Sequence, residues 1–502
     1  MIKDFAISII RTLREYGHQA YLCGGCVRDL LLGREPADYD ITTDATPDEV
    51  MRIFPDTYAV GAQFGVVLVP LPEHATYKSK QNIVISSDTR VASGNEGQSR
   101  NLLLSSYGQP SNSCHSERFF PREESAVSRN VSATKTLCVE VATFRSDIGY
   151  SDGRHPDEVR FTKDPRQDVQ RRDFTINGLL LDPLTNEVLD YVGGRKDLEA
   201  GIVRAIGDPT LRFTEDKLRM LRAVRFAARF GYVIDPATLR AIQKLAPQIH
   251  QVSRERVRDE LTKMLTEGHA RSAFLLLDET GLLHELLPEV ETMKGVEQPP
   301  QYHPEGDVFV HTLLLLENLP HPCPPTLAWG ALLHDVGKPP TFRIAPDRIR
   351  FDDHVNVGVK MAETFLRRLR FSNTDTEQIL ALVHNHMRFA DVERMKDSTF
   401  KRFVRMPRFD EHLELHRLDC EASHHDLHSY NFTREKMAAT PPADMSPEPL
   451  ITGKDLIAEG YEPGPRFKEI LSAVEDGQLD GHLQSKEAAM EFVHREFSLI
   501  PK

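Results

Sequence analysis

The chain has 502 residues, of which 40% are apolar and 27% are charged, a balance that excludes a mostly disordered or collagen-like protein. No run of about 18 uncharged apolar residues is present, so we expect no membrane-spanning helix. The six cysteines do not have the spacing of a disulfide framework, which favours a reducing, cytoplasmic location. The net charge of −13 argues against nucleic-acid binding by the whole surface, but it leaves room for a local basic strip.

The first 73 residues alternate between helical and strand patterns. Ile2, Phe5, Ile9 and Leu13 recur at helical spacing and predict an N-terminal helix. Thr46-Pro47 is typical of a helix start, with an N-cap followed by proline at the first helical position. Extended or β-branched runs predict strands at 38–43, 64–71 and 137–145.

Residues 74–136 have a different composition, rich in Ser, Asn, Arg and Gln, and their periodicity is poor. We interpret them as a disordered insertion between two strands, because the entropic cost of closing a loop grows only slowly with its length. A functional recognition loop is the alternative interpretation.

Beyond residue 200 the patterns are helical. Two segments that end at Gly231 and Gly268 are typical of helices stopped by a glycine. Residues 301–430 are helical and rich in histidine, and the stretch 437–449 predicts a linker before a last helical segment.

Asp38 and Asp40 lie two residues apart in a predicted strand, so both carboxylates would face the same side. Like charges at that distance are costly unless a cation neutralises them, and Mg²⁺ prefers such oxygen ligands. A pair of these ions suits in-line phosphoryl transfer. The preceding Gly24-Gly25 would let backbone N–H groups approach a triphosphate. Glu140 is the candidate third carboxylate.

Cys23 and Cys26 flank the diglycine and match the C-x-x-C pattern, which leaves a redox or zinc pair as an alternative. No second pair of cysteines completes a zinc site. The close approach of a triphosphate explains the two glycines better.

Six stretches resemble class II tRNA nucleotidyltransferases and bacterial poly(A) polymerases, in the DNA polymerase β superfamily. In chain order they are GGCVRDLLLG, DYDITT, RRDFTING, DYVGGRKDLEAGIVRAIGDP, EDKLRMLRAVRFAARFG and RERVRDEL. The resemblance implies an α+β fold, in which a DNA polymerase β-like nucleotidyltransferase head with a small mixed β-sheet precedes helical domains. It implies a head at 1–200, an all-α neck that binds RNA and nucleotide at 201–300, a helical domain at 301–436, and a linker with a helical tail at 437–502.

The same resemblance implies a set of site residues. Asp38 and Asp40, helped by Glu140, would be catalytic and hold Mg²⁺. RRDFTING resembles the ribose-contacting motif of the family. The residues implied to bind the nucleotide are Gly24, Gly25, Arg28, Arg171, Arg172, Asp173, Asn177, Asp216, Arg219, Arg222 and Arg225.

Asp216 and Arg219 lie three apart on a predicted helix and would share a face. An Asp accepts hydrogen bonds and an Arg donates them, which together match the edges of cytosine and adenine but not those of guanine or uracil. The alternative interpretation is a surface salt bridge. The resemblance favours base recognition, because the family places its templating Asp and Arg at these positions.

Basic residues outnumber acidic ones between Arg195 and Arg229, and such a strip suits a tRNA acceptor stem. A solvated helix face is the alternative. Residues 145–163 resemble a flexible loop that the family associates with addition of the terminal A, which argues against an enzyme that adds only C. The extension specific to poly(A) polymerases is not apparent.

Histidines and aspartates at 311–419 form a further pattern, in the order H…HD…H…H…D, which resembles the HD phosphohydrolase superfamily. By that resemblance His311, His334, Asp335 and Asp419 would bind one metal ion, and His354 and His384 a second. Imidazole and carboxylate together suit Ni²⁺, Mn²⁺ or another transition metal. A degenerate domain that serves only as scaffold is the alternative.

The sequence therefore predicts a template-independent tRNA nucleotidyltransferase that adds C and A from CTP and ATP to the tRNA 3′ end, with a second phosphohydrolase activity left open. The alternatives are an A-adding enzyme or poly(A) polymerase, an HD phosphohydrolase whose head only binds RNA, and a non-catalytic RNA chaperone.

Overall fold

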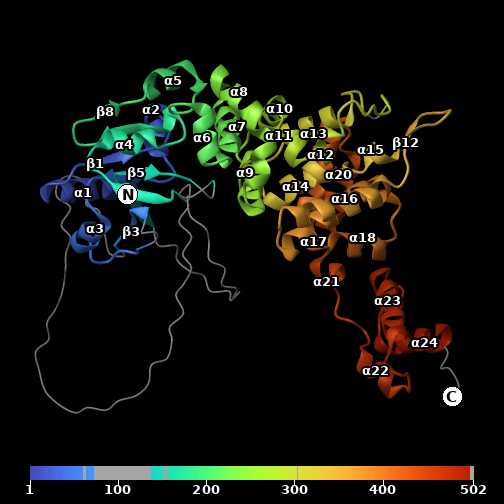
Figure 1. Cartoon of the computed structure of the whole chain (residues 1–502). Coiled ribbons are helices and arrows are strands. Elements are labelled where there is room, and N and C mark those ends of the chain that lie inside the picture. Colours follow the sequence, from blue (N-terminus) through green and yellow to red (C-terminus); the bar gives the residue numbers. More distant parts are fainter. Residues whose placement is uncertain (60–63, 73–136, 151–152, 154–155, 302, 498–502) are drawn as a thin grey trace, which may run out of the picture. The chain divides into compact units, whose positions relative to one another are not determined.

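The computed structural model describes residues 1–59, 64–72, 137–150, 153, 156–301 and 303–497 (Figure 1). The disordered insertion predicted at 74–136 lies outside the described residues. The chain forms two compact units, one of Met1–Ala223 with Tyr232–Leu245 and one of Val224–Gly231 with Ala246–Lys502. None of the helices in the described ranges is long and apolar enough to cross a bilayer.

A six-stranded mixed sheet forms the centre of the first unit, with strand order β3-β4-β2-β1-β7-β8. β2 pairs with β4 in parallel, whereas the other neighbours in the sheet are antiparallel. The strands are β1 (Ala20–Cys23), β2 (Asp40–Thr43), β3 (Val66–Pro70), β4 (Cys138–Thr143), β7 (Leu179–Asp182) and β8 (Glu187–Asp190). This sheet confirms the predicted fold class.

Two further strand pairs belong to the first unit. β5 (Arg145–Ile148) and β6 (Glu158–Phe161) are antiparallel, so the segment expected to be a flexible loop begins and ends as a hairpin. β9 (Ile202–Val203) and β10 (Val233–Ile234) are parallel.

The helices of the first unit begin and end where the sequence provides the signals. α1 buries Ala6, Ile9, Ile10 and Leu13 and contacts β1 and β2, which confirms the predicted N-terminal helix. α3 begins with a capping box at Thr46. The helices are α1 (Ile2–Glu15), α2 (Gly25–Leu31), α3 (Pro47–Ile53), α4 (Pro165–Gln170), α5 (Gly194–Ala200), α6 (Pro209–Glu215), α7 (Leu218–Phe230), which continues past the unit boundary, and α8 (Pro236–Leu245).

The second unit is helical around α14, whose residues Thr326–Leu333 are all buried. α14 contacts α9, α13, α17 and α19, and the indole Nε1 of Trp329 donates to Thr262 Oγ1 at 2.9 Å. The helices are α9 (Arg254–Thr266), α10 (Ala270–Glu279), α11 (Leu282–Leu286), α12 (Pro288–Glu291), α13 (Val308–Glu317), α14 (Pro325–Leu333), α15 (Lys338–Thr341), α16 (His354–Arg368), α17 (Asn373–Asn385), α18 (Asp397–Val404), α19 (Phe409–Ala422), α20 (His428–Ala439), α21 (Pro442–Met445), α22 (Gly453–Ala458), α23 (Pro465–Leu479) and α24 (Lys486–Glu496).

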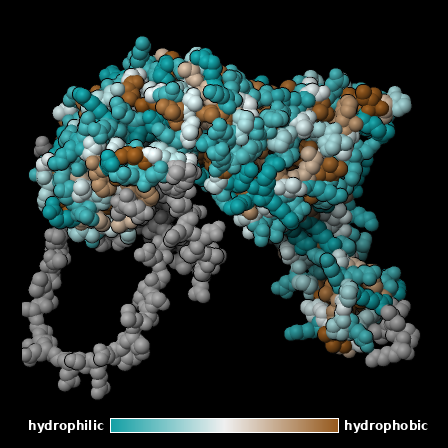
Figure 2. Space-filling model, viewed as in Figure 1, coloured by the Kyte–Doolittle hydropathy of each residue, from teal (hydrophilic) through white to brown (hydrophobic). Residues whose placement is uncertain are grey.

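A short hairpin of β11 (Phe342–Ile344) and β12 (Ile349–Phe351) follows α15. Phe342 and Ile344 are exposed there, and Figure 2 shows apolar atoms at this place. At the end of the chain α22, α23 and α24 enclose a small core of their own that includes Leu456, Ile470 and Val493.

The unit boundary falls inside the predicted neck at 201–300, and the predicted linker at 437–449 contains α21. The division into head, neck, histidine-rich domain and tail therefore stays a prediction, although the first unit includes the whole predicted head sheet.

Candidate active site and candidate metal centre

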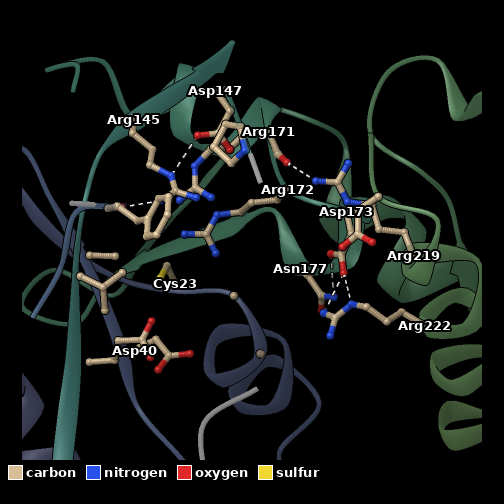
Figure 3. Close-up of a pocket in the computed structure, with 18 of the residues that line it drawn as sticks. Cys23, Asp40, Arg145, Asp147, Arg171, Arg172, Asp173, Asn177, Arg219 and Arg222 are labelled. Atoms are coloured by element: carbon tan, nitrogen blue, oxygen red, sulfur yellow. Dashed lines mark hydrogen bonds and ion pairs between the residues drawn. The ribbon is translucent and has the colours of Figure 1, made fainter. Parts of the chain in front are cut away.

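The parallel pairing of β2 with β4 places two of the three predicted carboxylates side by side. Asp40 is the first residue of β2, and its register partner on β4 is Glu140. Both line a cavity of about 150 Å³ together with Gly24 and Gly25 (Figure 3). Asp38 precedes β2 by two residues, so the strand begins later than predicted. That the Asp38 carboxylate lies on the same side as that of Asp40 stays a prediction.

The diglycine turn is shaped by backbone constraints. Gly24 has a φ of +71°, and a Cβ there would lie 3.1 Å from Nη1 of Arg172, so a side chain would be both strained and crowded. Cys23 and Cys26 are buried, and burial raises the pKa of Cys23 to about 11. A redox or zinc pair needs thiolates, so this geometry disfavours the C-x-x-C alternative.

Asp168 on α4 is a fully buried carboxylate that holds two of the predicted arginines. Its Oδ1 accepts from Nε and Nη2 of Arg171 at 2.9 and 2.7 Å, and its Oδ2 accepts from Nη2 of Arg172 at 3.0 Å. The hydroxyl of Thr42, on β2, also donates to Oδ2 at 3.3 Å. Burial alone would raise the pKa of Asp168, but Arg171 and Arg172 outweigh it and hold that pKa at about 2.

Asp173 and Asn177 are committed to contacts within the protein. Asp173 Oδ2 accepts from Nε of Arg222 at 2.8 Å, and its Oδ1 accepts from the Asn177 amide at 3.2 Å. Asn177 Oδ1 in turn accepts from Nη1 of Arg28 at 2.6 Å. Asp173, Asn177 and Arg222 line the cavity, whereas Arg28 is buried behind Asn177 and paired with Asp29. Arg28 is therefore placed to support the site from behind.

Asp216 and Arg219 both line the cavity and are both buried, but they do not share a helix face as predicted. Asp216 is extended, with φ −143° and ψ 107°, between α6 and α7, and its Oδ1 accepts from the Leu218 backbone N–H at 3.0 Å. Arg219 lies in the first turn of α7 and pairs with Glu215 at 2.6 Å. The helix is interrupted between α6 and α7 because Asp216 serves as a cap.

Arg225 was predicted to bind nucleotide, and the structure places it elsewhere. It is not among the described residues that line the cavity, and its Nε donates to Glu260 on α9 at 2.8 Å. Both side chains are buried. Arg225 therefore forms its ion pair within the second unit and not in the cavity.

The cavity has residues that the sequence pattern did not single out. Arg145, Asp147 and Tyr150 line it from the segment that begins with β5. Nε of Arg145 lies 3.0 Å from Asp147 Oδ1, and the Tyr150 hydroxyl donates to Asp147 Oδ2 at 2.9 Å. Burial lowers the pKa of Arg145 to about 10. The only sequence signal was the loop-like segment itself, which gave no reason to prefer these residues.

In Figure 3, Asp40 lies apart from the guanidinium groups that line the cavity, and Asp147 and Asp173 lie among those groups. Glu140 is the register partner of Asp40. Five arginines among the described residues line the cavity. These are Arg145, Arg171, Arg172, Arg219 and Arg222. Such an arrangement can hold a metal ion on the carboxylates while the arginines contact phosphate oxygens.

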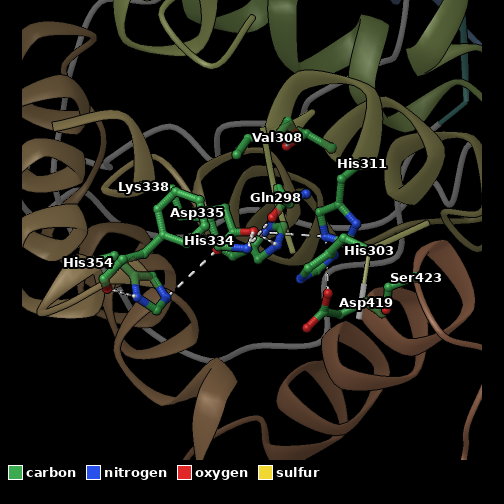
Figure 4. Close-up of polar contacts among 12 residues, drawn as sticks. Gln298, His303, Val308, His311, His334, Asp335, Lys338, His354, Asp419 and Ser423 are labelled. Atoms are coloured by element: carbon green, nitrogen blue, oxygen red, sulfur yellow. Dashed lines mark hydrogen bonds and ion pairs between the residues drawn. The ribbon is translucent and has the colours of Figure 1, made fainter. Parts of the chain in front are cut away.

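The predicted histidine centre forms inside the second unit, where α14 ends at His334-Asp335 (Figure 4). Nε2 of His334 lies 3.1 Å from Asp335 Oδ2, and Nε2 of His386 lies 3.7 Å from Asp335 Oδ1. His311 from α13 brings its Nε2 within 3.1 Å of Asp419 Oδ1 on α19. Three groups of potential ligands result among the described residues: His311, His334 and Asp419; Asp335, His354 and His386; and His303, Glu305 and His311.

The other nitrogen of each ring fixes its orientation. Nδ1 of His334, His354 and His386 lies 2.7–2.9 Å from a backbone carbonyl oxygen, of Ala331, Phe351 and Val383 respectively. Nδ1 of His311 instead lies 2.7 Å from Glu305 Oε1. The four Nε2 atoms are buried and have no hydrogen-bond partner. Nitrogen lone pairs held in this way are typical of metal ligands.

The choice of His384 as a ligand was wrong. His384 is exposed in the last turn of α17, whereas His386, two residues later, is buried and aimed at Asp335. Residues two apart in a helical segment point in different directions. Burial lowers the pKa of His386 to about 4, which keeps its imidazole neutral and able to donate a lone pair at pH 7.

Comparison with known proteins gives three matching family models and close relatives. Residues 20–99 and 111–204 match the poly A polymerase head domain, residues 231–294 the probable RNA and SrmB-binding site of polymerase A, and residues 309–429 the HD domain.

Two curated relatives and one solved structure extend the match. A CCA-adding enzyme of Bacillus pumilus is 28% identical, with 97% of this chain and 95% of that protein covered. An A-adding tRNA nucleotidyltransferase of Deinococcus radiodurans is 33% identical, with 65% and 78% covered. The crystal structure of the Bacillus stearothermophilus CCA-adding enzyme in complex with CTP is 26% identical, with a TM-score of 0.65 and 98% and 97% covered.

Asp168→Asn tests whether this carboxylate positions the cavity arginines. The variant keeps the shape of the side chain but loses the charge that holds Arg171 and Arg172. A hydrogen bond to a charged group contributes about 1.5–3 kcal/mol, so we expect affinity for a magnesium nucleoside triphosphate to fall about tenfold or more. Equilibrium dialysis measures this affinity.

The control is Asp164→Asn, at the N-cap of the same helix, where the carboxylate accepts from the Arg166 backbone N–H. It should leave the affinity unchanged. Equal affinities in both variants and the wild type would contradict the role of Asp168.

Proposed function

We propose that this chain, which belongs to the tRNA nucleotidyltransferase family, is a cytoplasmic CCA-adding enzyme that builds the tRNA 3′ end from CTP and ATP without a template strand. The observation that carries the proposal is the cavity that Asp40 and Glu140 line together with a group of arginines and with Asp216. A CCA-adding relative matched over nearly the whole of both chains supports this reading over the alternatives.

The carboxylate side of the cavity fits Mg²⁺. Asp40 and Glu140 lie side by side, with Asp38 nearby in the chain, and provide the oxygen donors that Mg²⁺ prefers. When bound, Mg²⁺ supplies charge neutralisation at the attacking and leaving oxygens. The reaction is attack of the tRNA 3′-hydroxyl on the α-phosphorus of the nucleotide, with pyrophosphate as the leaving group.

The arginine side would bind the nucleotide phosphates and sugar. Asp168 fixes Arg171 and Arg172, and Asp173 fixes Arg222, so the guanidinium groups are oriented before the substrate arrives. Groups held in advance lose little entropy on binding. Gly24 and Gly25 would complete the phosphate pocket, because both line the cavity and neither has a side chain of its own that would block a phosphate.

Base choice would fall to Asp216 and Arg219. The pair can offer one acceptor and one donor to the exocyclic amine and ring nitrogen of cytosine or adenine. Arg219 is anchored by Glu215 and by the carbonyl oxygens of Arg212 and Arg171, at 3.0 and 3.2 Å. That anchoring fixes the direction in which the guanidinium can donate, which is what base discrimination requires.

An A-adding enzyme is the second candidate within the family. The identity of 33% to an A-adding relative favours it, although that match covers less of this chain than the match to the CCA-adding enzyme of Bacillus pumilus. The two activities use the same nucleotide chemistry and differ in the RNA end that they accept.

Nucleotide incorporation into three tRNA transcripts, ending at the discriminator base, at C and at CC, tests the proposal. We expect C on the first two and a single A on the third, when CTP and ATP are supplied separately. Asp40→Ala should abolish incorporation, because it removes the carboxylate paired with Glu140. Asp56→Ala, at an exposed carboxylate, is the matched control and should keep full activity.

Addition of A to the CC transcript alone would support the A-adding enzyme instead. Long A tails on any RNA would indicate a poly(A) polymerase. Full activity of Asp40→Ala would remove the metal assignment.

A second activity is favoured by the four buried imidazole Nε2 atoms that gather around the carboxylates of Asp335 and Asp419 without a hydrogen bond. We propose that His311, His334, Asp335 and Asp419 hold one transition-metal ion, such as Ni²⁺ or Mn²⁺, and that His354 and His386 with Asp335 take a second. When bound, such ions activate water towards a phosphate ester. A metal-dependent phosphohydrolase that cleaves phosphomonoesters or 2′,3′-cyclic phosphates is the corresponding function.

Metal content and hydrolysis test that second activity. With added Ni²⁺ or Mn²⁺ the purified chain should bind metal and hydrolyse a phosphomonoester, and treatment with a chelator should remove both properties. His386→Ala should lose hydrolysis, whereas His384→Ala, two residues earlier and exposed, should keep it. No bound transition metal and no hydrolysis would contradict the phosphohydrolase.

A further inference from the structure

Glu305 joins two histidines at the edge of the HD centre. It lies in the segment before α13, and its Oε1 is 2.9 Å from Nδ1 of His303 and 2.7 Å from Nδ1 of His311. The His303 and His311 rings meet edge to face with centroids 5.0 Å apart. Neither the sequence pattern nor the proposed reaction uses Glu305 or His303.

The Glu305 carboxylate lies in surroundings that make its burial unfavourable. The Glu305 side chain is buried, and its Oε2 has no hydrogen-bond partner. A buried, unpaired carboxylate oxygen carries a desolvation penalty that a structural role alone does not require. A contact that persists in spite of such a cost often serves a functional site.

The partner of Nδ1 distinguishes His311 from the other three rings of the centre. His334, His354 and His386 are oriented by backbone carbonyl oxygens, which are neutral. His311 is oriented by an ionised carboxylate. A carboxylate behind a ligating imidazole raises the basicity of the other nitrogen and strengthens its bond to a metal ion.

The His311–His334–Asp419 group and the Asp335–His354–His386 group also differ in the charges around them. His311 and His334 are almost fully buried, and Asp419 adds a carboxylate to their group. The group of His354 and His386 has Asp335 as its carboxylate, and His354 keeps 13% of its side chain exposed. The Asp419 side chain is itself 23% exposed, so exposure to water does not distinguish the two groups. Charge does: Asp335 is paired with Lys338 at 2.7 Å, whereas the first group has the Glu305 carboxylate behind His311.

We propose that Glu305 is a positioning residue that makes the His311–His334–Asp419 position the stronger of two metal positions, which loads first. The position of Asp335, His354 and His386 then binds a second ion more weakly. This inference rests on the proposed metal centre of the HD domain. Glu305 acts through His311 and does not contact the metal ion itself.

A purely structural role for Glu305 makes a different prediction. If Glu305 only anchored the segment before α13, replacing His303 would weaken metal binding as much as removing the Glu305 charge, because both histidines contact Oε1. If Glu305 controls His311, removing His303 should leave metal binding intact. The two roles are therefore separable by metal affinity.

Calorimetric titration of the full chain with Ni²⁺ alone is the test, after chelator treatment, with thermal unfolding as the check on folding. Glu305→Gln keeps a hydrogen-bond acceptor for Nδ1 but removes the charge. We expect the first binding step to weaken about 10- to 100-fold, with the second step unchanged. Glu305→Asp, which keeps the charge, should recover part of the loss, and His303→Phe should bind Ni²⁺ as the wild type does.

Three outcomes would overturn the proposal. Wild-type affinity in Glu305→Gln would show that the charge is not used, and an equal loss in His303→Phe would indicate an anchor. Loss of a whole equivalent of Ni²⁺ in Glu305→Gln would make Glu305 a ligand. Failure of the wild type to bind Ni²⁺ is distinguishable from all of these, because it would reject the metal centre itself.

Discussion

The parallel pairing of β2 with β4 is the constraint on which the rest of the first unit depends. It sets Asp40 opposite Glu140 although 99 residues separate them in the chain. Two carboxylates so close together repel one another unless a cation lies between or beside them. The pairing therefore sets two oxygen donors that suit a metal ion side by side, and the arginines that line the same cavity suit phosphate.

Both sites of the molecule use fixed partners to orient the groups that do the chemistry. In the first unit Asp168 and Asp173 hold arginines by charge-assisted hydrogen bonds. In the second unit carbonyl oxygens and Glu305 hold the Nδ1 atoms, so that four Nε2 atoms meet around Asp335. The buried helix α14 delivers His334-Asp335 to that point. These groups are thus oriented when the chain folds, before any substrate binds.

The family resemblance implied the α+β fold, whereas local patterns predicted the N-terminal helix and the start of α3, because these depend on neighbouring residues. They placed Asp216 on a helix and missed that the chain breaks there, because an Asp as cap competes with helix continuation. They chose His384 over His386, since spacing alone cannot tell which of two nearby rings turns inward. The partners Asp168, Glu215 and Glu305 were missed, because a buried carboxylate that positions another side chain leaves no sequence pattern.

On the function proposed above, side chains of the protein, and no template strand, choose the base. The most direct test is the affinity of the full chain for CTP, ATP, UTP and GTP with Mg²⁺, measured by equilibrium dialysis in the absence of RNA. We expect CTP and ATP to bind at least about tenfold more tightly than UTP and GTP, since a mismatched hydrogen-bonding edge costs about 1–3 kcal/mol. Equal affinity for all four nucleotides would contradict it.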